Sequence, residues 1–74
     1  MNYTEVKSGH IAGIAYEHET QTLGVKFKTG EEYIFSGVHP VIHTEMMEAE
    51  SPGKYFHSNV RNIFQTKRIN SDRG

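Results

Sequence analysis

Residues 23–35 read LGVKFKTGEEYIF, and this stretch decides the fold. Apolar residues occupy alternate positions at both of its ends, which is typical of two half-buried β-strands joined by a short turn. A three-residue loop at 28–30 keeps the apolar side chains on one face, whereas a two-residue loop would mix the faces. The sequence therefore predicts a type I turn with a G1 bulge, in which Gly30 takes the left-handed conformation. The predicted cross-strand pairs are Val25–Tyr33 and Leu23–Phe35.

The preceding segment, residues 12–16, shows the same alternation and predicts another antiparallel strand. If Tyr16 pairs with Leu23, the apolar side chains of both strands share one face, which places a tight turn at Glu19-Thr20. The predicted pairs are Tyr16–Leu23, Ile14–Val25 and Ala12–Phe27. The aromatic side chains expected to face inward across the domain are Tyr16, Phe27, Tyr33, Phe35, Phe56 and Phe64.

Beyond Val38 the apolar spacing lengthens to that of a helix. Pro40 suits the first helical position, and the pattern predicts a helix of about ten residues. Its inner face is expected to carry Ile42, Met46 and Ala49. The Ser51-Pro52 pair ends this helix, because a residue before proline is driven out of the helical region, and a second helix begins there. Residues 65–69 alternate again, as an edge strand would, and residues 70–74 are expected to fray.

These elements predict a single α+β domain over residues 1–74, a three-stranded antiparallel meander with two short helices packed on it and a possible C-terminal edge strand. With 74 residues, the chain has a thin core. Such a domain gains stability when it buries apolar surface against a copy of itself, so a homo-oligomer is expected.

The composition and net charge of the chain argue against some classes of function. The formal net charge is −1, which argues against a protein that coats nucleic acid through its overall charge, so a site for a polyanion is expected to be local. The chain has no cysteine, in keeping with a cytoplasmic location, and its N-terminus lacks the apolar core of a secretory signal. No apolar run is long enough to cross a membrane, so no membrane partner is expected.

Residues 51–61, SPGKYFHSNVR, carry the strongest functional signal. If Ser51 is the N-cap, the free amides of the first helical turn suit an anion, and Gly53 allows a ligand close to the backbone. The spacing of Lys54, Ser58 and Arg61 places them on one helix face. The second, inward stripe is expected to consist of Phe56, Val60 and either Ile63 or Phe64. The predicted ligand-binding residues are Ser51, Gly53, Lys54, Tyr55, Ser58, Asn59 and Arg61.

Other interpretations of these residues stay open. Lys54 and Arg61 could form an ordinary solvated face. Tyr55 could stack on a base or pack on the sheet edge, and Asn59 could contact a base edge or a buried carbonyl.

Catalysis and metal binding are not expected. No serine lies in a motif that would activate it as a nucleophile, so the chain is not expected to be an enzyme. His39 and His43 have the spacing of two metal ligands on a helix, but His39 is expected at the helix cap. The sequence specifies no third ligand, since folding would have to bring in Glu45, Glu48 or His57. We therefore predict no metal site and no cofactor.

One set of residues extends over most of the chain. It consists of Ser8-Gly9-His10-Ile11, Tyr16, the strand with Leu23, Val25 and Phe27, Gly30 with Tyr33, Val38-His39-Pro40, Ala49 with Ser51, Gly53-Lys54-Tyr55-Phe56, and Asn59-Val60-Arg61. Together these residues resemble the KTSC domain family. The similarity runs from about residue 6 to residue 69. The chain departs from the family at Gly9, where a serine is common, at His10, where an asparagine is common, and at the extra His39 before Pro40.

The resemblance carries implications for source and function. KTSC domains occur as short free-standing proteins of bacteria and phages, and as an appendage of some lysyl-tRNA synthetases. That appendage is the reason an RNA-binding role has been proposed for the family. The resemblance thus implies a bacterial or phage source and allows RNA as a partner.

Three functions remain from the sequence. The first, which we favour, is a non-catalytic module that captures a phosphate-bearing ligand, such as a small signalling nucleotide, at the start of the second helix. The second is RNA binding over a broader basic surface made of Lys26, Lys28, Lys54, Arg61, Lys67 and Arg68. The third is a protein-interaction or assembly module that uses an edge strand and the Met46-Met47 pair.

Overall fold

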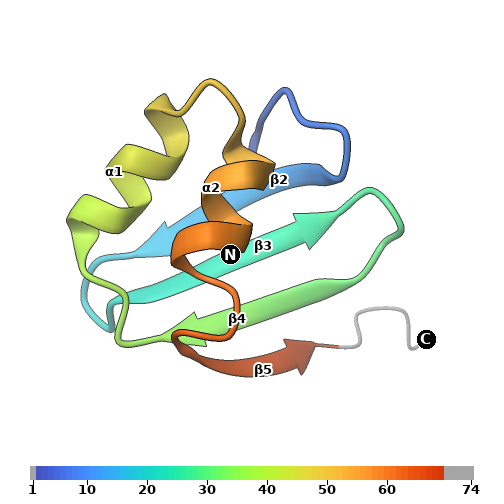
Figure 1. Cartoon of the computed structure of the whole chain (residues 1–74). Helices are drawn as coiled ribbons and strands as arrows, with labels where there is room; N and C mark the ends of the chain where they lie inside the picture. Colours follow the sequence, from blue (N-terminus) through green and yellow to red (C-terminus); the bar gives the residue numbers. More distant parts are fainter. Residues whose placement is uncertain (1, 70–74) are drawn as a thin grey trace.

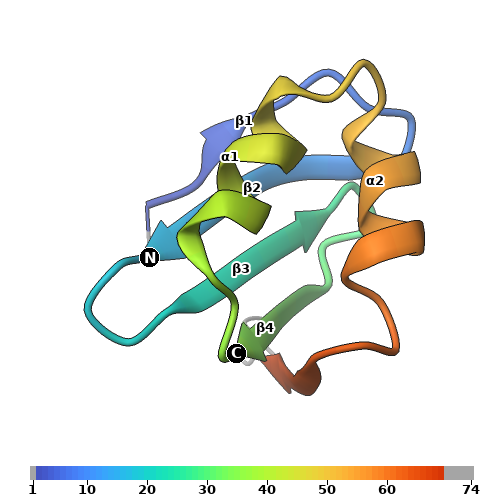
Figure 2. The same ribbon diagram turned by 60° about the vertical axis from the view of Figure 1, so that its left-hand side comes forward.

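The computed structural model describes residues 2–69, which form one antiparallel sheet with two helices on one of its faces (Figures 1 and 2). The strands lie in the order β1-β2-β3-β4-β5, so each strand pairs with its neighbours in sequence. The elements are β1 (Thr4–Glu5), β2 (Ile11–Glu17), β3 (Thr22–Phe27), β4 (Glu32–Ser36), α1 (Pro40–Glu48), α2 (Pro52–Asn59) and β5 (Gln65–Ile69). The predicted α+β class is confirmed, with five strands in the sheet.

The β3–β4 hairpin has the predicted register, with Val25 opposite Tyr33 and Leu23 opposite Phe35. At its turn, the Gly30 amide donates to the Phe27 carbonyl at 2.9 Å, and the Phe27 amide donates to the Glu31 carbonyl at 2.8 Å. Gly30 has φ +100°. The three-residue loop with a left-handed glycine is thus confirmed.

The predicted β2–β3 register is confirmed near the turn, whereas the prediction for the other end of the two strands is wrong. Tyr16 pairs with Leu23 and Ile14 with Val25, but Phe27 pairs with Ile11 in place of Ala12, because the register shifts between Ile11 and Gly13. The shift lets the larger Ile11 side chain become fully buried while Ala12 is only partly buried, which removes more apolar surface from water. The expected tight turn at Glu19-Thr20 is a turn over residues 18–21, and its last pair is Glu17–Thr22.

The two outer strands differ in how well the sequence indicates them. β5 pairs along its length with β4, which confirms the edge strand over residues 65–69. β1 was not predicted, because its two residues are too few to show an alternation. It pairs with Ile14 and Gly13 of β2 and gives the sheet its other edge (Figure 2). The predicted frayed tail, residues 70–74, lies outside the described residues.

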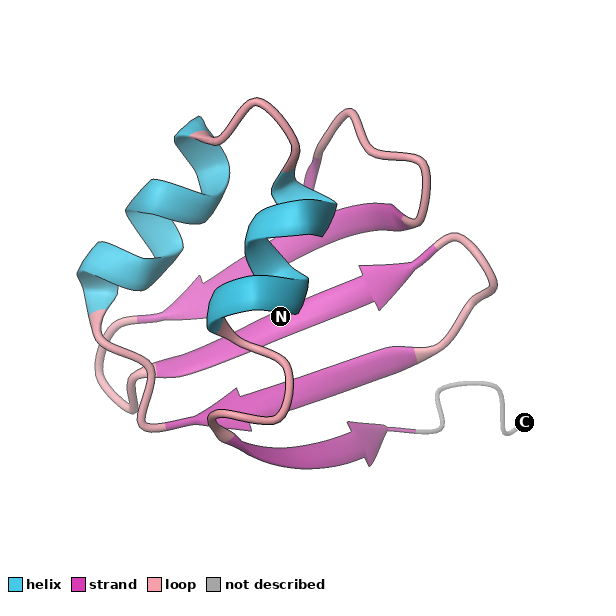
Figure 3. Cartoon of the chain, in the orientation of Figure 1, coloured by secondary structure: helices cyan, strands magenta, loops and turns pink. Residues whose placement is uncertain are grey.

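Both helices start where the sequence places them (Figure 3). His39 caps α1, since its Nδ1 accepts the Val41 amide at 3.2 Å, and Pro40 is the first helical residue. Ser51 caps α2, since its Oγ accepts the Lys54 amide at 3.4 Å. The cap residues therefore satisfy amides that the first helical turn leaves without a partner.

The core lies between the helices and the inner strands. Its buried side chains are Ile11, Ile14, Leu23, Val25, Phe35, Val38, Met46, Phe56 and Val60. Phe64 packs against this core while Ile63 is 61% exposed, so Phe64 completes the inward stripe. Of the six rings predicted to face inward, Phe35 and Phe56 are buried. The other four, Tyr16, Phe27, Tyr33 and Phe64, are partly buried and pack against the core. No helix among residues 2–69 is long and apolar enough to cross a membrane.

Candidate ligand-binding cleft

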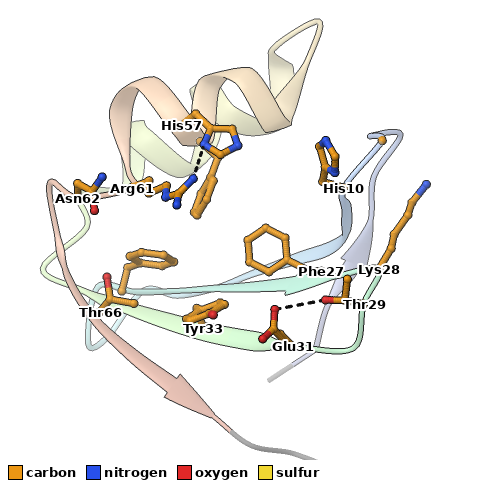
Figure 4. Close-up of a pocket in the computed structure, with 13 residues that line it drawn as sticks. His10, Phe27, Lys28, Thr29, Glu31, Tyr33, His57, Arg61, Asn62 and Thr66 are labelled. Carbon is orange, nitrogen blue, oxygen red and sulfur yellow. Dashed lines mark hydrogen bonds between the residues drawn. The ribbon is translucent and has the colours of Figure 1, made fainter.

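A cleft of about 630 Å³ lies between α2 and the helix-facing side of the sheet (Figure 4). Its lining comes from the loop before β2, the β3–β4 hairpin, α2, the turn after α2, and β5. Its volume is within the range of small-molecule binding sites. The lining residues are Gly9, His10, Phe27, Lys28, Thr29, Glu31, Tyr33, Phe35, Phe56, His57, Arg61, Asn62 and Thr66.

Aromatic rings form the apolar part of this lining. Phe27 meets Tyr33 edge to face, with ring centroids 5.6 Å apart and an interplanar angle of 80°. Phe27 also meets Phe56 at 5.6 Å and 71°, and Phe35 meets Phe56 at 5.4 Å and 76°. Phe35 and Phe56 belong to the buried core, whereas Phe27 and Tyr33 are half-buried. The cleft therefore offers aromatic surface that the core holds in place.

Basic side chains reach the cleft from two directions. His57 in α2 and Arg61 just after it form one pair, with Arg61 Nη1 3.2 Å from His57 Nδ1. His10 and Lys28 form the other, and the Lys28 amide donates to the His10 carbonyl at 2.8 Å. This backbone bond holds the loop before β2 against the β3–β4 hairpin. Arg61 and Lys28, which are distant in sequence, thus supply positive charge to one cleft.

Polar groups complete the lining. Thr29 Oγ1 donates to Glu31 Oε1 at 3.4 Å, and Thr66 Oγ1 donates to the Phe64 carbonyl at 3.1 Å. Asn62 has φ +67° in the turn that leads from α2 to β5. Glu31 makes the lining mixed in charge, so an anion in the cleft has to lie nearer the basic groups than the carboxylate.

The structure places one of the seven predicted ligand-binding residues, Arg61, in the lining of this cleft. α2 ends at Asn59, so Arg61 lies beyond the regular helix that carries Lys54 and Ser58. Lys54 and Ser58 are exposed and do not line the cleft. The structure therefore does not bring the two predicted cations together in it.

The other four predicted residues make contacts within the domain. Ser51 caps α2, and Gly53 is buried, where a Cβ would lie 3.2 Å from Ser8 Oγ. Asn59 Nδ2 donates to the Tyr55 carbonyl at 3.2 Å. The Tyr55 hydroxyl donates to Glu45 Oε1 of α1 at 2.6 Å, and its burial, with this bond, raises the pKa of Tyr55 to about 12. Tyr55 thus joins the two helices.

Sequence reasoning missed most of the cleft. It assigned Phe27 and Tyr33 to the core, because alternation identifies the face of a strand and not what covers that face. It considered His57 only as a possible third metal ligand or an ordinary exposed histidine, and it noted His10 only as a departure from the family pattern. Lys28, as a member of the broader basic surface, was the one signal for the hairpin side of the cleft.

The histidines considered as metal ligands have other roles. His39 Nδ1 caps α1, and the ring of His43 stacks on Tyr16 with centroids 4.9 Å apart and an interplanar angle of 8°. His18 meets the edge of the same tyrosine at 4.8 Å. Among the residues that the structure describes, no group of three or more metal-ligating side chains is placed to hold an ion.

Known proteins are similar to this chain in sequence and in fold. The family model of the KTSC domain matches residues 7–64. The chain is 29% identical over 59 residues to the lysine–tRNA ligase of Nostoc punctiforme, and 33% identical over 54 residues to that of Trichormus variabilis. These matches cover 80% and 73% of the chain but only 10% of each ligase.

Two relatives are closer to the chain in length. It is 30% identical over 56 residues to a protein of Stutzerimonas stutzeri, which covers 76% of the chain and 79% of that protein. The crystal structure of a KTSC domain protein from Yersinia pestis matches with a TM-score of 0.88 and 27% identity, over 93% of the chain and 97% of the other. The sequence and the fold together show that this chain belongs to the KTSC domain family.

Proposed function

We propose that this KTSC domain is a non-catalytic module that binds a phosphate-bearing nucleotide in the cleft between α2 and the β3–β4 hairpin. The observation that carries the proposal is the joint placement of half-buried aromatic rings and basic side chains around one cavity of nucleotide size. Aromatic rings stack on any nucleobase, because every base has a π-face, and basic side chains neutralise phosphate.

Each end of a nucleotide has a partner in this arrangement. The base would lie against Phe27 or Tyr33, whose rings the core holds at a fixed angle. The phosphate would contact Arg61, whose planar guanidinium matches the geometry of phosphate oxygens. His57 lies beside Arg61 and restricts its position. Since the net charge of the chain is −1, local contacts of this kind would supply the affinity.

The start of α2 is a second position for the phosphate, with Lys54 and the first-turn amides as donors. We favour the cleft for two reasons. Ser51 Oγ already accepts the Lys54 amide, and the buried Gly53 faces Ser8. In this proposal Tyr55 supports the helix pair and does not stack on a base.

Isothermal titration calorimetry with a panel of linear and cyclic nucleotides tests the proposal. Loss of one charge-assisted contact should weaken binding about tenfold or more, so Arg61→Ala is expected to lower affinity by at least that factor. Lys54→Ala, another exposed cation of the same region, is the matched control and should leave affinity unchanged. If Lys54→Ala weakens binding and Arg61→Ala does not, the site lies at the start of α2. No binding below about millimolar by any nucleotide would contradict the proposal.

RNA binding is the second candidate, because the chain matches part of lysine–tRNA ligases, proteins that are named for an RNA. A strand would place one base in the cleft and continue to cations outside it, such as Lys67. Fluorescence anisotropy with single-stranded RNA at several salt concentrations separates the candidates. Several phosphate contacts give a steep fall of affinity with salt, whereas one nucleotide in the cleft gives a shallow one.

A further inference from the structure

The basic side chains of the cleft lie at two separate margins (Figure 4). Arg61 and His57 belong to the α2 side, and His10 and Lys28 belong to the side formed by the loop before β2 and the hairpin. Figure 4 shows the two pairs apart, with the Phe27 ring between them. Positive charge therefore flanks an aromatic centre on both sides.

Each margin is held by contacts of its own. Arg61 Nη1 is 3.2 Å from His57 Nδ1 on the α2 side. On the other side, Ser8 Oγ accepts the amides of His10 and Ile11 at 3.3 and 3.2 Å, which shapes the loop that carries His10. The Lys28 amide then bonds to the His10 carbonyl. Different hydrogen bonds thus hold the two margins, so an exposed side-chain substitution at one margin is expected to leave the other in place.

The acidic side chain of the cleft lies away from the α2 margin. Glu31 lies between Tyr33 and Thr29 in Figure 4, at the sheet side of the cavity. A phosphate over the sheet would be repelled by this carboxylate, whereas an aromatic base would not be. The lining therefore favours an uncharged ring over the sheet and an anionic group at the Arg61 margin. On the hairpin side, an anionic group has to lie nearer the Lys28 ammonium than the Glu31 carboxylate, which is bonded to Thr29.

We infer that the cleft takes a nucleoside that carries phosphate on both its 5′ and its 3′ side. This inference rests on the proposed function and names the ligand class of that same site. One phosphate can pair with the Arg61 margin and the other with the Lys28 margin, while the base lies at the Phe27 and Tyr33 rings between them. Two kinds of ligand have phosphate on both sides of one nucleoside: a free nucleoside 3′,5′-bisphosphate and an internal nucleotide of an RNA strand.

Calorimetry on the full chain with three probes tests the inference: adenosine 3′,5′-bisphosphate, adenosine 5′-monophosphate and adenosine 3′-monophosphate. The bisphosphate should bind about tenfold or more tightly than either monophosphate, because it adds one charge-assisted contact. Lys28→Ala should remove this advantage, and it should leave unchanged the affinity of the monophosphate that uses the Arg61 margin. Arg61→Ala should also remove the advantage of the bisphosphate, and it should leave unchanged the affinity of the monophosphate that uses the Lys28 margin.

Lys26→Ala is the matched control, since Lys26 is an exposed lysine of the same hairpin that does not line the cleft. It should not change the affinity of any probe. Circular dichroism of each variant establishes that the exposed substitutions leave the fold intact. Equal affinities of bisphosphate and monophosphates, or equal loss for every probe in Lys28→Ala, would overturn the inference while the proposed function stands. Absence of binding by all three probes would overturn the inference, whereas the proposed function falls only if the whole nucleotide panel fails to bind.

A trinucleotide probe distinguishes the two sources of this chemistry. If the trinucleotide ApApA, whose central nucleotide has phosphate on both sides, binds far more tightly than the bisphosphate, the natural ligand is an RNA strand. If the two bind alike, contacts beyond one nucleotide add nothing, and the ligand is a small free nucleotide. In both cases, Lys28→Ala and Arg61→Ala should each weaken trinucleotide binding, because the central nucleotide uses both margins.

Discussion

Gly30 is the residue on which the β3–β4 turn depends most directly. Its φ of +100° lies in a region that side chains with a Cβ rarely adopt, and a Cβ added at this position would have no other atom within 4 Å. The requirement for glycine is therefore conformational and not a matter of space. The same hairpin carries Phe27, Lys28 and Tyr33, so this turn also shapes one side of the cleft.

Gly30→Val is expected to lower the free energy of unfolding by about 1–3 kcal/mol, the usual cost of a residue held in a sparsely populated conformation. Urea unfolding followed by circular dichroism measures the change. Gly9→Ala is the control, because Gly9 also has open space around it but does not have a positive φ. Equal destabilisation by the two substitutions would show that backbone strain at residue 30 is not the cause.

Tyr3 is a second residue whose role only the structure shows. Its hydroxyl donates to Glu32 Oε1 of β4 at 3.1 Å, and its side chain lies on Gly13, where an added Cβ would be 3.0 Å from Tyr3 Cβ. Burial and the Glu32 carboxylate raise the pKa of Tyr3 to about 12. The N-terminal segment is thus attached to the middle of the sheet.

Tyr3→Phe removes this bond but keeps the ring, so it should cost about 0.5–1.5 kcal/mol of unfolding free energy. Tyr3→Ala should cost more, because the ring also covers Gly13. Chemical denaturation of both variants beside the wild-type chain provides the measurement. A Tyr3→Phe variant as stable as the wild type would mean that water replaces the tyrosine hydroxyl as the partner of Glu32 without loss.

At the scale of elements, an aromatic contact attaches α1 to β2. The His43 ring of α1 stacks on Tyr16, and the Tyr16 hydroxyl donates to the Val38 carbonyl just before the helix. Burial lowers the pKa of His43 below its ordinary value of 6.5, and repulsion from His18 lowers it further. The folded state therefore favours the neutral imidazole.

The sign of the resulting pH dependence follows from linkage. The unfolded chain binds a proton at residue 43 with the ordinary pKa of 6.5, and the folded chain does so only at lower pH. The unfolding free energy should therefore be highest above pH 6.5 and should fall as the pH decreases below it. Urea unfolding at about pH 7.5 and about pH 5.5, on either side of that pKa, measures this loss. His43→Phe keeps a stacking ring without the proton, so its stability should change less between the two conditions; an unchanged difference would assign the effect to other groups.

At the scale of the whole molecule, one thin core holds both layers together. Met46 is the only fully buried side chain of α1, so it anchors that helix on the sheet. A domain of this size has a small reserve of stability, and its elements are expected to unfold together. Loss of one core side chain should therefore affect the entire chain.

Met46→Ala should lower the free energy of unfolding by about 2–5 kcal/mol, because it removes buried apolar atoms and leaves a cavity. Val41→Ala in the same helix is the control, since Val41 is 48% exposed, and it should change stability by no more than about 0.5 kcal/mol. Far-ultraviolet and near-ultraviolet circular dichroism should report one common transition for Met46→Ala. Two separate transitions would indicate that α1 detaches on its own.

Local rules in the sequence determined the elements of this protein. Alternation predicted β2, β3, β4 and β5, proline and capping residues predicted both helix starts, and Gly30 predicted the β3–β4 turn. These features depend on neighbours close in sequence, so one chain suffices to recognise them. The bulge near Ile11 escaped this reasoning, because it depends on which side chain fills the core.

The tertiary structure alone decided where the candidate site lies. Periodicity predicted that Phe27 and Tyr33 face the helices, but their exposure depends on how far α2 extends over the sheet. Likewise, His10, Lys28, His57 and Arg61 share a cleft only because the sheet brings the loop before β2 and the hairpin opposite α2. A pattern along the chain reports the direction of a side chain from its backbone, whereas a cleft depends on the space that distant elements leave unfilled.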